Sequence, residues 1–208
     1  MSNPELKSLN RFQKTRRSAL LALLLIVVVG LLFCGPVFTD AHYENDVIEI
    51  TGIGLIGVAI MGRLWCTLYL GGRKAAEVVT KGPYSIARNP LYMFSAIGSA
   101  GVGAQMGSLT VGLLFGAVTV LAFYIVIFRE EAFLRKALGT PYQTYCAVVP
   151  RFLPNFSLYQ DSEIVSFYPE RLRSTLRDGL VFFLAAPAFE LIQRGQEWGY
   201  LPVLFRLP

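Results

Sequence analysis

Residues 78–92 form a short polar stretch between apolar segments, and they include the side chains best suited to binding a charged small molecule. The stretch reads V-V-T-K-G-P-Y-S-I-A-R-N-P-L-Y and contains an arginine, an asparagine and two tyrosines. Gly82-Pro83 and Asn89-Pro90 both indicate turns, because proline fixes φ and disfavours helix in the residue before it. We therefore expect a folded loop that can hold a ligand. A plain connecting loop is the alternative, since positive charges are routine on cytoplasmic loops.

A second polar cluster, residues 129–154, begins with Arg129, Glu130 and Glu131 at the end of an apolar run. Carboxylates accept hydrogen bonds and arginine donates them, so the two clusters are complementary in chemistry. The alternative is a solvated interfacial helix with i,i+4 pairs such as Glu131–Arg135. The two clusters can act together only if the fold brings them to one place.

The composition is that of a membrane protein. Of the 208 residues, 54% are hydrophobic and 16% are charged, against about 25% charged residues in typical soluble domains. The length predicts a single domain, residues 1–208. The apolar composition predicts that its partner is the lipid bilayer. The net charge of +5 does not indicate nucleic-acid binding, because most basic residues flank apolar runs. The three cysteines lack metal-ligand spacing and His42 is the only histidine, so no metal site is predicted.

The apolar runs are long enough to cross a bilayer of about 30 Å, and they predict an all-α fold, a multi-pass transmembrane bundle of about five helices. The charge-free run after residue 89 is too long for one span, and a turn divides it into a tight helical hairpin. We interpret the first run as a retained helix, because it is longer than a signal-peptide core and no cleavage site follows it. The predicted membrane helices are residues 18–38, 50–70, 91–104 and 109–128, with residues 179–193 as a short fifth membrane or re-entrant helix.

The charges in the loops predict the orientation of the chain. The N-terminus and the regions 71–90 and 129–177 are basic, which is typical of cytoplasmic segments. The acidic loop at 39–49 and the uncharged turn at 103–108 are then expected on the other side of the membrane. Both polar clusters should therefore lie on the cytoplasmic face, where they can form one pocket.

Two features of the second apolar run need an interpretation of their own. Arg63 is a charge within a span, which is costly and usually faces protein, so we assign it an inward role toward a substrate. Gly52 to Gly57 match G-x-G-x-x-G, but no strand-turn-helix unit surrounds them and no acidic residue follows about twenty positions later. We interpret these glycines as a helix-packing surface rather than a dinucleotide site.

Two motifs in fixed order resemble a known family. The first is G-P-Y-S-I-A-R-N-P-L-Y at residues 82–92; the second is E-E-A-F-L-R-K-A-L-G-T-P-Y-Q-T-Y at 130–145, which V-P-R-F-L-P follows at 149–154. This pattern resembles the isoprenylcysteine carboxyl methyltransferase and phospholipid methyltransferase superfamily, whose members are integral membrane enzymes that use S-adenosylmethionine. The resemblance covers residues 76–154, and it implies that residues 76–92 and 129–154 are cofactor-binding motifs.

The resemblance also implies roles for individual residues, although Asn89 stands where the family motif commonly has histidine. The cofactor-binding residues would be Val78, Val79, Tyr84, Arg88, Asn89, Pro90, Leu91, Tyr92 and Glu130. The catalytic residues would be Arg129 and Glu130, and the residues on the substrate side would be Arg129, Glu131 and Tyr142. Arg63 joins the substrate side only because it is a charge within a span, since it lies outside the resemblance. In these roles Arg88 would pair with the carboxylate of the cofactor, and Glu130 would accept hydrogen bonds from its hydroxyl or amino groups.

The expected function is methyl transfer to a lipidic or amphiphilic acceptor, at a carboxyl oxygen, an amine nitrogen or a thiol sulfur. Two other functions stay open. An NADPH-dependent sterol-type membrane reductase is one, because Y-C-A-V-V-P at residues 145–150 resembles the ending of such enzymes. A non-catalytic membrane scaffold with the same fold is the other. Binding of S-adenosylmethionine, of NADPH or of neither separates the three.

Overall fold

The structure is a computed structural model that describes residues 34–36, 42–70, 77–203 and 205–207. Two three-residue strands, β1 (Cys34–Pro36) and β2 (Phe205–Leu207), pair in parallel, with Cys34 opposite Phe205. The helix predicted at 18–38 is therefore wrong at residues 34–36, where a glycine and a proline disfavour helix. The rest of that prediction, like residue 76 of the first motif, lies outside the described residues. All other regular elements are helical, so the predicted all-α class is confirmed in this part of the chain.

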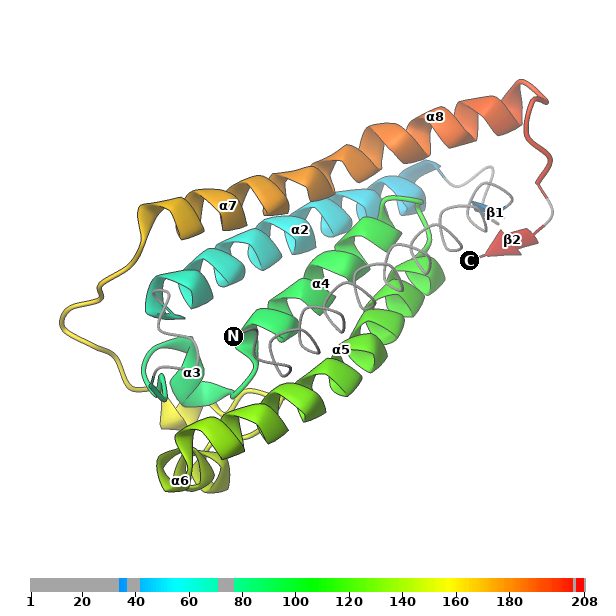
Figure 1. Ribbon diagram of the computed structural model, residues 1–208. Helices are drawn as coiled ribbons and strands as arrows, with labels where there is room; N and C mark the ends of the chain where they lie inside the picture. The colour runs from blue at the N-terminus through cyan, green and yellow to red at the C-terminus, as the bar shows by residue number, and fades with distance from the viewer. Residues whose placement is uncertain (1–33, 37–41, 71–76, 204, 208) are drawn as a thin grey trace, which may run out of the picture.

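Three long helices form the body of the molecule: α2 (His42–Leu70), α4 (Pro90–Ala104) and α5 (Leu109–Leu138). Helix α4 lies between the other two and packs against both (Figure 1). Residues Asp46–Leu70 and Leu109–Leu138 are long and apolar enough to cross a membrane. Helix α4 has only 15 residues, as expected for the short first arm of a hairpin.

Helix α5 extends ten residues beyond the predicted end at 128, to Leu138. The charged residues after position 128 are good helix formers, and the next stop signal is Gly139, whose φ of 61° favours glycine. The hairpin turn before α5 is closed by Ser108, whose side chain accepts a hydrogen bond from the backbone N–H of Val111. As a result, Glu130 and Glu131 stand on the last turns of a helix that can span a membrane.

Close packing of α2 on α4 depends on glycines from both helices, and the two backbones come nearest at Gly52 and Gly101. A Cβ atom on Gly52 would lie 2.8 Å from the carbonyl oxygen of Gly101, and one on Gly101 would lie 2.7 Å from the carbonyl oxygen of Gly52. Gly54 and Gly57 would meet no described atom within 4 Å. Of the G-x-G-x-x-G run, only Gly52 therefore serves the packing role that we predicted for these glycines.

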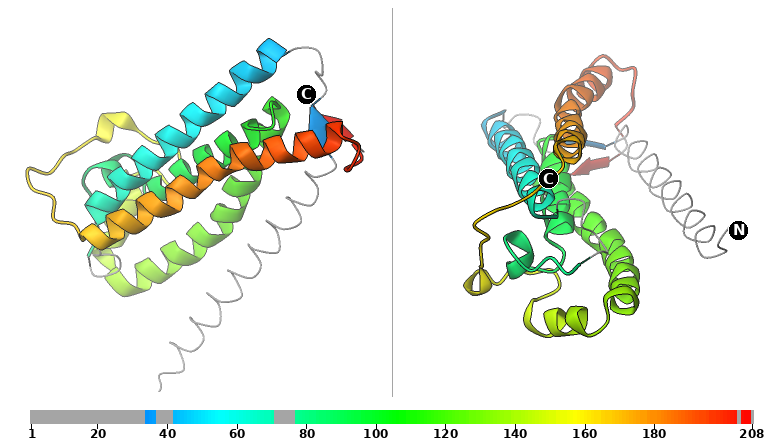
Figure 2. Two further views of the ribbon diagram at one scale, coloured as in Figure 1. Left: turned by 90° about the horizontal axis from the view of Figure 1, so that it is seen from above. Right: turned by 60° about the vertical axis from the view of Figure 1, so that its left-hand side comes forward.

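The C-terminal helices form a rod whose first part packs along α2. Helix α7 (Pro169–Leu180), the 3-10 turn η2 (Val181–Leu184) and α8 (Ala185–Glu197) follow one another in nearly one direction (Figures 1 and 2). The Thr175 hydroxyl lies 3.0 Å from that of Thr67, near the C-terminal end of α2. At the other end, Phe189 packs on Met106 and Val111 beside the hairpin turn. The predicted segment 179–193 thus belongs to a rod that runs the length of the bundle, and its place as a fifth membrane or re-entrant helix stays a prediction.

Candidate functional site

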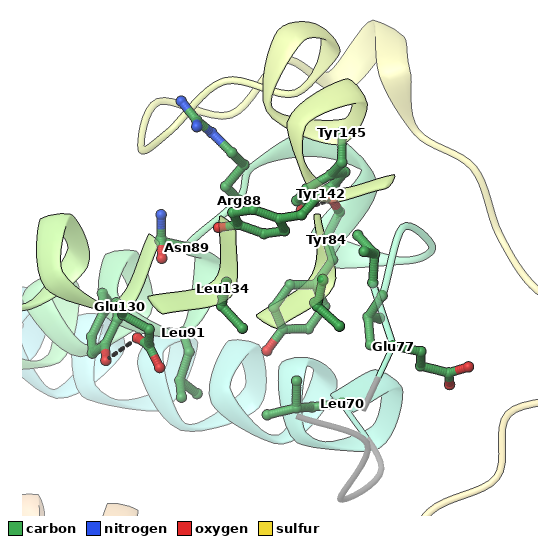
Figure 3. A pocket seen from close by; sticks show the side chains of 14 residues that line it. Leu70, Glu77, Tyr84, Arg88, Asn89, Leu91, Glu130, Leu134, Tyr142 and Tyr145 are labelled. Atoms are coloured by element: carbon green, nitrogen blue, oxygen red, sulfur yellow. Dashed lines mark hydrogen bonds between the residues drawn. The ribbon is translucent and has the colours of Figure 1, made fainter. Parts of the chain in front are cut away.

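A pocket lies at the end of the bundle where α2 stops, α4 begins and the last turns of α5 meet α6 (Thr140–Val148). It has a volume of about 670 Å³, including the solvent at its open mouth. Figure 3 shows the side chains that face it. They are Leu70, Glu77, Val78, Val79, Tyr84, Arg88, Asn89, Leu91, Tyr92, Glu130, Leu134, Leu138, Tyr142 and Tyr145.

The predicted loop between α2 and α4 is folded around a one-turn helix, α3 (Pro83–Ile86). Gly82 begins it with a φ of 59°, and a Cβ atom there would lie 2.5 Å from the ring of Tyr69, so no larger residue fits. The Ser85 hydroxyl donates to the carbonyl oxygen of Gly82 at 2.6 Å. The Tyr145 hydroxyl, from α6, donates to the carbonyl oxygen of Tyr84 at 2.7 Å. The loop is thus held by a hydrogen bond of its own and by Tyr145 of the second motif.

Glu130 is the carboxylate of α5 that faces the pocket. Its Oε2 accepts a hydrogen bond of 2.8 Å from the Tyr92 hydroxyl, drawn as a dashed line in Figure 3. Tyr92 is itself supported by the ring of Phe123, with 4.7 Å between the ring centroids. The carboxylate is therefore oriented before any ligand binds, and it comes from the second motif while its partner comes from the first.

Glu131, the next residue, is turned away from the pocket and is buried, with 4% of its side chain exposed. Its Oε2 lies 3.3 Å from Nη1 of Arg88 and 3.1 Å from Nη2 of Arg151. Its Oε1 accepts from Nδ2 of Asn89 at 3.3 Å and from Nε of Arg151 at 3.2 Å. One buried carboxylate thus joins the first motif, helix α5 and the segment after α6. We expected Glu131 to face the substrate, and its position in this ion-pair cluster corrects that expectation.

Arg151 is the member of this cluster to which sequence reasoning gave no role. It lies in the V-P-R-F-L-P run of the second motif, and this position could have indicated a role for it. Its guanidinium stands 4.5 Å from the centroid of the Phe128 ring, and its hydrogen bond to Glu131 raises the pKa of Arg151. The backbone carbonyl of Arg151 also accepts from Nδ2 of Asn89 at 3.1 Å.

Arg88 lines the pocket, but its charged end serves the cluster. In Figure 3 its guanidinium extends away from Leu70 and Leu91, and Nη1 donates to Glu131. The Nε atom is buried and has no hydrogen-bond partner among the residues that the structure describes. The predicted pairing of Arg88 with a carboxylate of the cofactor therefore competes with an ion pair that the fold already makes.

Three buried tyrosines complete the wall of the pocket. Burial raises the pKa of Tyr84 well above its ordinary value, and burial likewise raises the pKa of Tyr142 and of Tyr145. All three hydroxyls are therefore protonated at neutral pH. They offer aromatic faces and neutral hydroxyl groups rather than a base.

The structure brings most of the predicted residues together and places four of them elsewhere. Those that line the pocket are Val78, Val79, Tyr84, Arg88, Asn89, Leu91, Tyr92, Glu130 and Tyr142. Pro90 is buried in the first turn of α4, and Arg129 is exposed on α5. Arg63 donates to the Ser95 hydroxyl at 2.7 Å, two turns before the end of α2. Sequence reasoning missed the pocket role of Leu70, Glu77, Leu134, Leu138 and Tyr145.

Comparison with known proteins gives a family and two relatives. The profile described as phospholipid methyltransferase matches residues 48–141. The chain is 30% identical over 189 residues to the nickel-cobalt-cadmium resistance protein NccN of Alcaligenes xylosoxydans xylosoxydans, covering 88% of this chain and 87% of that protein. It is 30% identical over 201 residues to the cobalt-zinc-cadmium resistance protein CzcN of Cupriavidus metallidurans, covering 97% and 93%. No solved structure was found to match the chain.

Proposed function

Because this chain belongs to the phospholipid methyltransferase family, we propose that it is a membrane enzyme that transfers a methyl group from S-adenosylmethionine to a lipidic or amphiphilic acceptor. One observation carries the proposal. The two motifs, about forty residues apart in the sequence, meet in a single pocket at one end of two helices that can span a membrane. Two surface segments without a shared role would not be expected to line the same cavity.

The donor set of this pocket fits the proposed cofactor. When bound, S-adenosylmethionine supplies a methyl group on a positively charged sulfur. Glu130 can accept hydrogen bonds from hydroxyl or amino groups, and Tyr92 holds that carboxylate in place. The rings of Tyr84 and Tyr142 offer faces that attract a cation. The aliphatic side chains of the wall, such as Leu134, cover the remaining surface and exclude water.

The chain contributes alignment and shielding more than acid–base chemistry. Displacement at a methyl group needs the reacting atoms aligned in a site from which water is excluded. The buried hydroxyls of the pocket stay protonated, so they can orient groups but cannot take a proton at neutral pH. Arg129 is exposed one residue before Glu130. We propose that its guanidinium binds the acceptor as the acceptor approaches the pocket mouth.

The position of the pocket favours an acceptor drawn from the bilayer. Leu70 and Glu130 both line it, and each stands near the end of a helix that can cross a membrane. We propose a multi-pass chain with its N-terminus and its pocket on the cytoplasmic side, because the basic loops gather there. An amphiphile could then place its polar group at Glu130 while its apolar part stays in the lipid.

Cofactor binding by the purified protein tests the proposal. In calorimetric titration we expect S-adenosylmethionine to bind and NADPH not to bind. Glu130→Gln should raise the dissociation constant roughly ten- to a hundred-fold, the scale of a hydrogen bond to a charged group. Glu190→Gln is the matched control, because Glu190 is an exposed partner of Arg194 on α8, and its affinity should equal that of the wild type. Binding of NADPH would support a reductase instead, and binding of neither would support a scaffold.

A cellular role is a second proposal, which the two relatives favour. The name of NccN attributes to it resistance to nickel, cobalt and cadmium, and the name of CzcN attributes to it resistance to cobalt, zinc and cadmium. We propose that this chain contributes to resistance to such metal ions through the chemistry of its pocket. In a strain that lacks the chain, the wild type should restore growth on cobalt and cadmium, whereas Glu130→Gln should not. Full restoration by Glu130→Gln would separate resistance from the pocket.

A further inference from the structure

The segment that joins α6 to α7, residues 150–168, exposes an unusual number of large apolar side chains. We call this segment the strap. Phe156 is 71% exposed and Ile164 is 83% exposed. The exposed large apolar residues of the strap are Leu153, Phe156, Tyr159, Ile164, Phe167 and Tyr168. Large contiguous apolar surfaces mark places where a protein meets another protein or a membrane.

The strap is an ordered element, so this exposure is a property of the fold. The backbone N–H of Arg88 donates to the carbonyl oxygen of Pro150 at 2.8 Å, and that of Asn155 donates to Ile86 at 2.9 Å. The N–H of Gly82 donates to the carbonyl oxygen of Gln160 at 2.8 Å. One edge of the strap is thus hydrogen-bonded along the pocket loop, and its apolar side chains are directed elsewhere.

Contacts with α2 place the strap at the level where that helix leaves the membrane. The ring of Tyr159 lies against the ring of Trp65, with 6.2 Å between centroids. Trp65 belongs to the stretch Asp46–Leu70 that can span a membrane, and it stands about 7 Å before the end of α2 at 1.5 Å per residue. Tyr69, one turn later, donates a hydrogen bond to Asp161 of the strap. Tryptophan and tyrosine are enriched at this level of a bilayer.

We propose that the strap is an interfacial membrane anchor, whose exposed apolar side chains are immersed in the headgroup–acyl boundary of the leaflet on the pocket side. The occupant of this surface is the bilayer, because Tyr159 of the strap packs on Trp65, at the aromatic end of a helix that can span a membrane. Its hydrogen-bonded edge holds the pocket loop, so the anchor fixes the pocket mouth at the membrane surface. This inference needs the membrane location of the chain and is independent of methyl transfer.

Quenching by brominated lipids tests the anchor. Phe156→Trp and Ile164→Trp are each made in a Trp65→Phe/Trp198→Phe background and reconstituted into bilayers. Both sites are exposed, so the larger ring fits without repacking. We expect loss of fluorescence with lipids brominated near the headgroup, a smaller loss with lipids brominated near the bilayer centre, and protection from aqueous acrylamide. Leu121→Trp, on the exposed face of α5, is the reference for a side chain within the span.

Two results would overturn the proposal. Quenching by acrylamide without quenching by brominated lipid, at both positions, would show that the strap faces water. Protection from both quenchers, together with a concentration-dependent dimer, would show that a second copy of the chain covers it. The two tryptophan sites are independent, so a defect in one variant does not decide the result. Neither outcome depends on whether the pocket binds S-adenosylmethionine.

Discussion

Replacing Glu131 by glutamine removes the charge that joins the two motifs, with almost no change in shape. The side chain of Glu131 is 4% exposed, and its partners Arg88 and Arg151 are 10% and 28% exposed. After the substitution the guanidinium of Arg88 is a buried charge without an ion-pair partner in the part of the chain that the structure describes. Breaking a buried ion pair from one side typically costs about 3–5 kcal/mol. We take about 3 kcal/mol, because the amide oxygen still accepts a hydrogen bond and Arg151 can turn to water.

This loss of stability is large enough to measure in detergent. For a chain of about this size, each kcal/mol shifts the midpoint of thermal unfolding by about 2–4 °C. We therefore expect Glu131→Gln to unfold about 6–12 °C below the wild type. Intrinsic tryptophan fluorescence follows the transition, and it needs no bound ligand.

The neighbouring residue provides the matched control. Glu130→Gln makes the same chemical change one position earlier, on a half-buried side chain that faces the pocket. It should leave the unfolding midpoint within a few degrees of the wild type while it weakens cofactor binding. A wild-type midpoint for Glu131→Gln, or an equal fall for both variants, would refute the division between a structural and a functional glutamate.

Three further predictions follow from the same geometry. Arg88→Lys should raise the dissociation constant for S-adenosylmethionine about tenfold in calorimetry, because lysine lacks the second terminal nitrogen with which the guanidinium could pair with the carboxylate of the cofactor while Nη1 contacts Glu131; unchanged affinity would show that Arg88 does not bind that carboxylate. Burial raises the pKa of Tyr142 and Tyr145 above the pKa that they have in the unfolded chain. Their contribution to stability should therefore be complete below about pH 10 and lost as the pH rises further. Unfolding midpoints measured against pH should be flat near neutrality and fall at alkaline pH, and Tyr142→Phe should lessen that fall. Since the C-terminal rod runs to the end opposite the pocket, alkaline phosphatase fused after Val203 should be active outside the cytoplasm; an inactive phosphatase and a fluorescent GFP fusion at that position would contradict this topology.

The sequence predicted the central parts of α2, α4 and α5 and the two motifs that meet at the pocket, because their signals are local, although α2 begins at His42, eight residues before the predicted start. Proline at the start of α4 and glycine at the end of α5 mark helix ends whether those ends are buried or exposed. The predicted membrane helix ended at residue 128, whereas α5 continues to Leu138. The change from apolar to charged residues marks the edge of the membrane, and the helix continues beyond it. Membership of the methyltransferase superfamily, inferred from the two motifs, is confirmed.

The roles of adjacent charged residues could not be read from the sequence. Glu130 and Glu131 differ by one position, and a helix turns about 100° per residue, so they must face different surroundings. Which of them faces the pocket depends on where Arg151 lies, twenty residues later, and no local pattern gives that distance. Arg63 shows the same limit: its partner, the hydroxyl of Ser95, is thirty-two positions away on another helix.

The transfer of a labelled methyl group tests the central claim most directly. Membranes that contain the wild-type chain are incubated with S-adenosylmethionine labelled in its methyl group, next to membranes that contain Glu130→Gln and Glu190→Gln. We predict that label enters an extract made with organic solvent, that Glu190→Gln preserves this incorporation, and that Glu130→Gln abolishes most of it. Equal incorporation in the wild type and Glu130→Gln, or in membranes that lack the chain, would contradict the assignment of this pocket to methyl transfer.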